Sequence, residues 1–79
     1  MTKQILAIEM KQGMQVHAHD ALFTLGEIYN RQGVSWSKGV CKAPSEFMLS
    51  NKPYFYDVNS GEWLWQFQGN ENRTLTIVK

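Results

Sequence analysis

Cysteine is almost absent from this sequence: Cys41 is the only one among 79 residues. A single cysteine cannot form an internal disulfide, which excludes a disulfide-stapled secreted scaffold. Long apolar runs are lacking too, since none approaches the roughly 20 residues that cross a bilayer as a helix. The first residues also lack the long apolar stretch of a signal peptide. We therefore expect a cytoplasmic protein without a membrane segment.

Charge of one sign is also lacking. Eight Lys and Arg residues are balanced by seven Asp and Glu, which gives a net charge of +1. This balance argues against a histone-like polycation and against an acidic mimic of DNA. A hydrophobic content of 43% excludes a disordered chain. We expect a single domain, residues 1–79, with a net stability of roughly 5 kcal/mol; homodimerisation would bury further apolar surface.

Catalytic and cofactor motifs are missing as well. The six glycines are too dispersed to cradle a phosphate, and the acidic residues are scattered. Cys41 has no nucleophile signature beside it and is expected to pack as a small hydrophobe. His17 and His19 project to the same face of a predicted strand, but a closed zinc site needs four ligands and the chain offers no third histidine. We therefore expect no enzymatic activity, no metal and no cofactor.

What the sequence does contain is alternation of apolar and polar residues, which is typical of half-buried strands. Residues 4–10 alternate with Leu6, Ile8 and Met10 on one face, and residues 14–18 form a second predicted strand after a turn at residues 11–13. Further strands are expected at residues 34–40, with a polar outer face, and at residues 74–78. The segment 42–52 reads as an irregular connection.

Residues 20–33 show a helical period instead. The apolar positions form one stripe of an amphipathic helix, Asp20 is a good N-cap, and Gly33 can end the helix. The predicted fold is therefore α+β, one amphipathic helix packed on an antiparallel sheet of about five strands. The alternative reads this stretch as two more strands of a small all-β barrel. The stripe consists of Ala21, Leu22, Leu25, Ile28 and Tyr29.

An aromatic hairpin is predicted at residues 53–67. Its turn has Asp57 accepting backbone amides and Gly61 at a positive φ. This register places Tyr56 opposite Trp63 and Tyr54 opposite Trp65. The aromatic face is expected to form core against the helix, because so small a chain needs that area buried. A stacking platform for RNA or single-stranded nucleic acid is the alternative, with the site Lys38, Lys42, Lys52, Tyr54, Tyr56, Trp63 and Trp65.

The outer face of the predicted helix supplies the main candidate site. At about 100° per residue, Phe23 points away from the apolar stripe and lies beside polar neighbours. An exposed phenylalanine of this kind can anchor a protein partner. We therefore expect a partner-binding site formed by Phe23, Glu27, Asn30 and Arg31. The polar face of the third strand around Ser35, Ser37 and Lys38 is the next surface to consider.

The element order also resembles that of small phage-encoded α+β proteins, including some type I anti-CRISPR inhibitors. The resemblance covers about residues 3–67 and consists of a strand, the strand "GMQVHA", the helix "DALFTLGEIYNRQG" and antiparallel strands. It implies a phage-encoded inhibitor, an anti-defence protein that occupies the surface of a host protein in the host cytoplasm. Together these observations predict a small non-enzymatic binding protein. Its partner is expected to be another protein, and RNA or single-stranded nucleic acid is the alternative.

Overall fold

Strands make up most of the molecule. The computed structural model describes residues 2–78, and its strands form one antiparallel sheet with only short helices beside it. The predicted α+β class was therefore wrong, and the structure is closer to the all-β alternative. The strands are β1 (Thr2–Leu6), β2 (Gln15–Ala18), β3 (Ala21–Arg31), β4 (Val34–Cys41), β5 (Tyr56–Asp57), β6 (Glu62–Gly69) and β7 (Thr74–Val78). The helices are the 3₁₀ turn η1 (Ala7–Glu9), α1 (Glu46–Ser50) and α2 (Lys52–Phe55).

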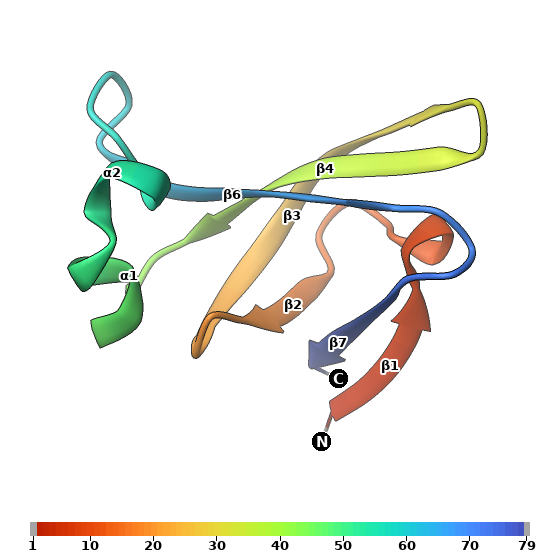
Figure 1. Cartoon of the computed structure of the whole chain (residues 1–79), viewed down its shortest axis with the longest axis horizontal. Coiled ribbons are helices and arrows are strands. Elements are labelled where there is room, and N and C mark those ends of the chain that lie inside the picture. Colours follow the sequence, from red (N-terminus) through yellow and green to blue (C-terminus); the bar gives the residue numbers. More distant parts are fainter. Residues whose placement is uncertain (1, 79) are drawn as a thin grey trace.

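The strand order is β1-β7-β2-β3-β4-β6-β5. Figure 1 shows α1 and α2 at one end of the molecule, with β6 running from that end towards η1 at the other. The C-terminal strand β7 pairs with both β1 and β2, so the two ends of the chain lie close together (Figure 1). This order leaves β1 at one edge of the sheet and β6, with the two-residue β5, at the other.

Residues 20–33 are not a helix: β3 occupies most of this stretch and pairs with β2 on one side and β4 on the other. His19 and Asp20 have φ of 53° and 59°, and Gln32 and Gly33 have φ of 54° and 78°. Two-residue hairpin turns of type I′ have positive φ at both central positions. Asp20 and Gly33 are therefore turn residues rather than helix caps.

The buried residues of β3 follow the two-residue period of a strand and not the predicted helical stripe. Ala21, Phe23 and Leu25 alternate inward along β3, and Phe23 is fully buried, with no exposed surface. A register shift between Leu25 and Ile28 then interrupts the pairing with β4. The buried apolar core consists of Ile5, Ala7, Met10, Val16, Ala21, Phe23, Leu25, Cys41, Met48, Phe55, Phe67, Leu75 and Ile77.

Strand β4 is confirmed, but its two faces are reversed relative to the prediction. Ser35 and Ser37 are buried, while Trp36 and Val40 lie on the outer face and are half-buried. The buried hydroxyls have partners: Ser37 Oγ donates to the carbonyl of Gly26 at 3.1 Å, and Ser35 Oγ accepts from Asn30 Nδ2 at 2.7 Å. Because these bonds satisfy the hydroxyls, burial of the serines carries little penalty.

The hairpin turn is confirmed. Asn59 N and Ser60 Oγ donate to the Asp57 carboxylate at 3.1 and 2.9 Å, and Gly61 has a φ of 72°. Tyr56 lies opposite Trp63 as predicted.

Three other segments differ from the prediction. Tyr54 lies in α2 and does not pair with Trp65. The first strand ends at Leu6 and is followed by η1. The predicted connection at residues 42–52 contains α1, which buries Met48 and leaves Phe47 and Leu49 exposed. The last strand, β7, matches the strand predicted at residues 74–78, and it buries Leu75 and Ile77.

Candidate functional site: the free edge of β6

The open side of β6 is the most distinctive feature of the sheet. Residues 62 and 63 pair with β5, but the residues after them pair with β4 alone among the described strands. We call residues 64–68 (Leu64, Trp65, Gln66, Phe67 and Gln68) the free edge. Natural proteins usually protect such an edge with charge or proline. No charged residue and no proline occurs from Trp63 to Asn70. The opposite edge strand, β1, has the exposed Lys3.

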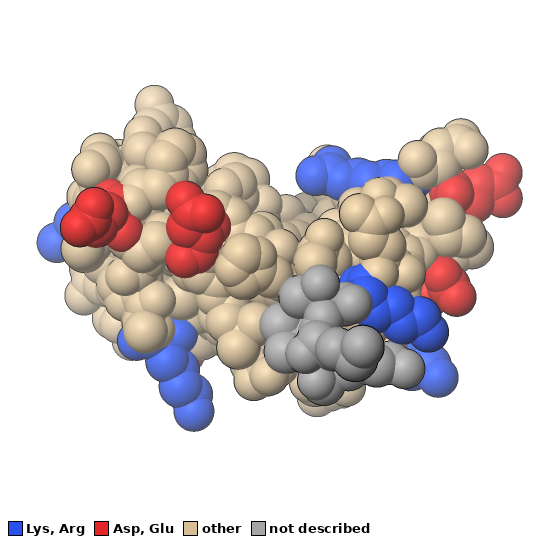
Figure 2. All heavy atoms as spheres, turned by 90° about the horizontal axis from the view of Figure 1, so that it is seen from below, with Lys and Arg blue, Asp and Glu red and all other residues tan. Residues whose placement is uncertain are grey.

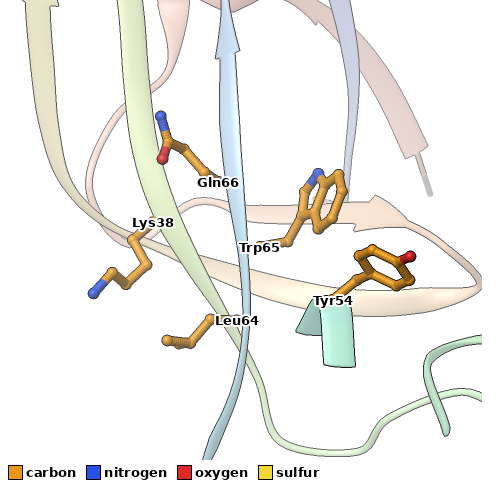
Figure 3. A pocket seen from close by; sticks show the side chains of 5 residues that line it. All are labelled: Lys38, Tyr54, Leu64, Trp65 and Gln66. Atoms are coloured by element: carbon orange, nitrogen blue, oxygen red, sulfur yellow. The ribbon is translucent and has the colours of Figure 1, made fainter. Parts of the chain in front are cut away.

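A hollow of about 310 Å³ lies at this free edge. In Figure 3, Lys38 comes from β4, Leu64 and Gln66 lie with it on one side of β6, and Trp65 and Tyr54 lie on the other. Lys38 is the only charged residue of the five that line it, and Tyr54 is 76% exposed. We call this the edge hollow. It offers a cation, an amide and two aromatic rings beside unpaired backbone.

A second, almost wholly apolar hollow of about 230 Å³ adjoins the first and shares Tyr54 and Trp65 with it. Its centre is His19, whose ring stacks on Phe47 at 5.7 Å and meets Trp65 edge-on at 4.7 Å. Phe55 completes the cluster, 5.0 Å from His19 and 4.9 Å from Trp65 between ring centroids. We call it the aromatic hollow; its lining residues are His19, Phe47, Asn51, Tyr54, Phe55 and Trp65.

The electrostatics of this cluster favour a neutral imidazole. Desolvation by the surrounding rings lowers the pKa of His19 below its ordinary value of 6.5, and the nearby carboxylate of Asp20 opposes the shift in part. His19 therefore behaves near pH 7 as a flat, uncharged ring. The aromatic hollow is accordingly suited to an apolar side chain.

Ser45 holds the helices against this cluster. Its hydroxyl donates to the carbonyl of His19 at 2.6 Å and accepts from the amide of Met48 at 3.3 Å, which caps α1. Asn51, between the two helices, donates through Nδ2 to the carbonyl of Phe47 at 2.8 Å. The turn before β3 and the two helices are thus joined by hydrogen bonds around the aromatic hollow.

The outer face of the sheet has a further hollow of about 220 Å³. Leu22, Val40 and Lys42 are among its lining residues. It lies on β2, β3 and β4, away from the free edge. On the face seen in Figure 2, acidic and basic side chains of the described residues occur together at both ends.

The residues of the predicted helical site are not brought together on one exposed face. The buried Phe23 meets Phe67 edge-on at 5.3 Å, so it cannot be a solvent-facing anchor. Glu27 accepts a hydrogen bond from the Tyr29 hydroxyl at 3.1 Å, which raises the pKa of that phenol. Asn30 bonds to Ser35 inside the hairpin, and Arg31 is exposed at the end of β3. Of the next candidates, Ser35 and Ser37 are buried and Lys38 is exposed.

The predicted nucleic-acid site is divided by the fold. Lys38, Tyr54 and Trp65 share the edge hollow. Tyr56 and Trp63 pack on each other at 5.0 Å, with Lys52 Nζ 4.7 Å from the centre of the Tyr56 ring. Lys42 lines the separate outer hollow. The aromatic face is thus part core and part surface, since Trp63 and Trp65 are half-buried.

The two histidines have different environments. His17 is exposed on β2, whereas His19 belongs to the aromatic cluster, and the described residues contain no group of three or more potential metal ligands. Cys41 is buried in the core. No helix among the described residues has the length and apolar character needed to cross a membrane.

Sequence reasoning missed both the free edge and the role of His19. The uncharged run from Trp63 to Asn70 was a usable signal for an unprotected edge. The aromatic cluster had no such signal, because its members come from three separate segments of the chain. No protein family, curated protein or solved structure matches the chain.

Proposed function

We propose that this protein is a non-enzymatic binding module that receives an extended segment of a partner protein along the free edge of β6. Strand addition to an exposed edge gains affinity from backbone hydrogen bonds and specificity from hollows that receive alternate side chains. The observation that carries the proposal is the uncharged free edge, which lies directly beside the edge hollow. An inhibitor of the kind that the resemblance implies would act by occupying a segment its target needs.

The exposed ring of Tyr54 provides the test. A displayed library of random nine-residue peptides is selected on the protein, and enriched peptides are measured against Tyr54→Ala. Loss of an exposed aromatic contact is expected to weaken binding by tenfold or more, on the order of 1.4 kcal/mol. Tyr29→Ala is the matched control, because Tyr29 is also exposed but lies on β3, away from both hollows. Its affinity should equal that of the wild type.

Two results would contradict the proposal. One is a selection without enrichment of any peptide. The other is equal weakening by the two tyrosine variants, which would mean that the peptides do not bind at the free edge.

Single-stranded nucleic acid is the second candidate partner, because Lys38, Tyr54 and Trp65 offer a cation and two stacking surfaces in one hollow. Binding of an oligonucleotide pool is then expected to weaken steeply with added salt, as phosphate contacts release counterions. Peptide binding at the free edge should depend only weakly on salt. A salt dependence that is reduced in Lys38→Ala, the cation of the hollow, would favour nucleic acid over the peptide.

A further inference from the structure

The edge hollow has lining residues on both sides of β6, and the aromatic hollow adjoins it on the side of Trp65 and Tyr54, which the two hollows share (Figure 3). Leu64, Gln66 and Lys38 border β6 on its outer face, and Trp65 lies on its inner face with the His19 cluster. Successive side chains of a strand point to opposite faces. A strand paired with the free edge would therefore offer one side chain to the Lys38 side of the edge hollow and the adjacent side chain to the aromatic hollow.

The two hollows differ in chemistry. The aromatic hollow has four aromatic side chains besides a histidine that is neutral near pH 7, with no lysine or arginine among its lining residues. The edge hollow has Lys38 as its one charged group, with the uncharged Gln66 opposite it in the pairing of β4 and β6. An anionic side chain complements the edge hollow, and an apolar one complements the aromatic hollow.

The spacing indicates which anion fits best. Neighbouring strands lie about 4.8 Å apart, so a strand added to β6 would lie about 10 Å from β4, where Lys38 originates. Only long side chains extended towards each other from both strands cover that distance. Glutamate therefore suits the position better than the shorter aspartate.

We infer that the segment received by β6 carries an acidic side chain, preferably glutamate, for Lys38 and an adjacent apolar side chain for the aromatic hollow. This inference rests on the proposed function and specifies the sequence of the segment. Exposed ion pairs contribute little to stability. Lys38 is therefore expected to determine the choice of charge at this position more than the total affinity.

The test is a charge exchange at Lys38. The same random nine-residue library is selected separately on the wild type, on Lys38→Glu and on Lys42→Glu. Lys38 and Lys42 are both exposed, so neither substitution removes a core contact. Peptides from the wild type should have an acidic residue beside an apolar one, and those from Lys38→Glu should have lysine or arginine at that position. Lys42→Glu is the matched control and should retain the acidic preference.

The strongest wild-type peptide, synthesised with its acidic residue and with lysine in its place, should reverse its order of affinity between wild type and Lys38→Glu. An unchanged charge preference in Lys38→Glu would overturn the inference, and so would a change of equal size in Lys42→Glu. If peptides bind in a Tyr54-dependent way without any charge preference, the inference fails while the proposed function stands. If no peptide is enriched on the wild type, both fail.

Discussion

Phe23 is at the centre of the core. Its side chain is fully buried on β3, its ring meets Phe67 edge-on, and the backbone of Gly39 passes close to both. A Cβ at position 39 would be 2.6 Å from the Phe67 ring and 3.1 Å from Cβ of Phe23. The absence of a side chain at Gly39 is therefore what allows the two rings to pack against the sheet.

Truncation of Phe23 should destabilise the fold strongly. Phe23→Ala leaves a cavity in a closely packed core and is expected to lower the free energy of unfolding by about 3–5 kcal/mol. Leu22→Ala, one residue away on the opposite face and 38% exposed, should cost less than about 1 kcal/mol. Chemical unfolding followed by tryptophan fluorescence measures both. Equal losses would mean that β3 does not present Phe23 to the core.

His19 should make stability depend on pH. Because burial lowers its pKa from 6.5, the unfolded chain binds more protons than the folded one over the interval between the two values. Its contribution to stability is therefore complete above about pH 6.5 and is lost as the pH falls through the folded pKa. Urea midpoints measured at about pH 7.5 and about pH 5.5 should differ more for the wild type than for His19→Asn.

Asparagine is the suitable replacement because His19 has a φ of 53°, a conformation that asparagine adopts more readily than most residues. His17→Asn is the control, since His17 is exposed on β2 and takes no part in the aromatic cluster. It should retain the pH response of the wild type. The same pH response in His19→Asn as in the wild type would mean that His19 does not cause the pH dependence of stability.

At the scale of elements, β3 shows why a strand was predicted as a helix. Ala21, Leu25 and Ile28 fit a helical stripe, but Ala21, Phe23 and Leu25 fit a strand equally well. The choice depends on pairing with β4 from beyond the next turn, which a local period does not include. The Asp57–Gly61 turn was predictable because its bonds join residues at most four apart.

Single residues of the candidate site were predicted, but their arrangement was not, because it too depends on contacts between distant segments. Lys38, Tyr54 and Trp65 were each singled out, but their meeting at one hollow depends on the register of β4 with β6 and on the position of α2. Strand β4 shows the same limit: Ser35 is buried and Val40 lies on the outer face, the reverse of the prediction. Alternation predicts that a strand has two faces, but it does not determine which face is buried.

The junction between α1 and the turn at His19 depends on one hydroxyl. Ser45→Ala removes the cap of α1 and the bond to the His19 carbonyl, and should cost about 1–2 kcal/mol. Ser50→Ala, at the exposed end of the same helix, should change stability by less than about 0.5 kcal/mol. Thermal unfolding measures both. A Ser45→Ala variant as stable as the wild type would mean that α1 is held in place by packing alone.

At the scale of the whole molecule, the sheet has two open edges that differ in protection. β1 carries the exposed Lys3. The free edge of β6 has neither charge nor proline and is bordered by both hollows. A peptide strand is therefore expected to bind at the free edge of β6, and β1 serves as the control edge.

Amide hydrogen exchange with and without an enriched peptide, followed by NMR, tests the central claim most directly. Amides of the free edge that point away from β4 are expected to exchange fast in the free protein and to become protected by tenfold or more when the peptide binds. The amides of β1 should exchange equally in both states. Protection along β1, or tight peptide binding that leaves exchange along residues 64–68 unchanged, would contradict the account.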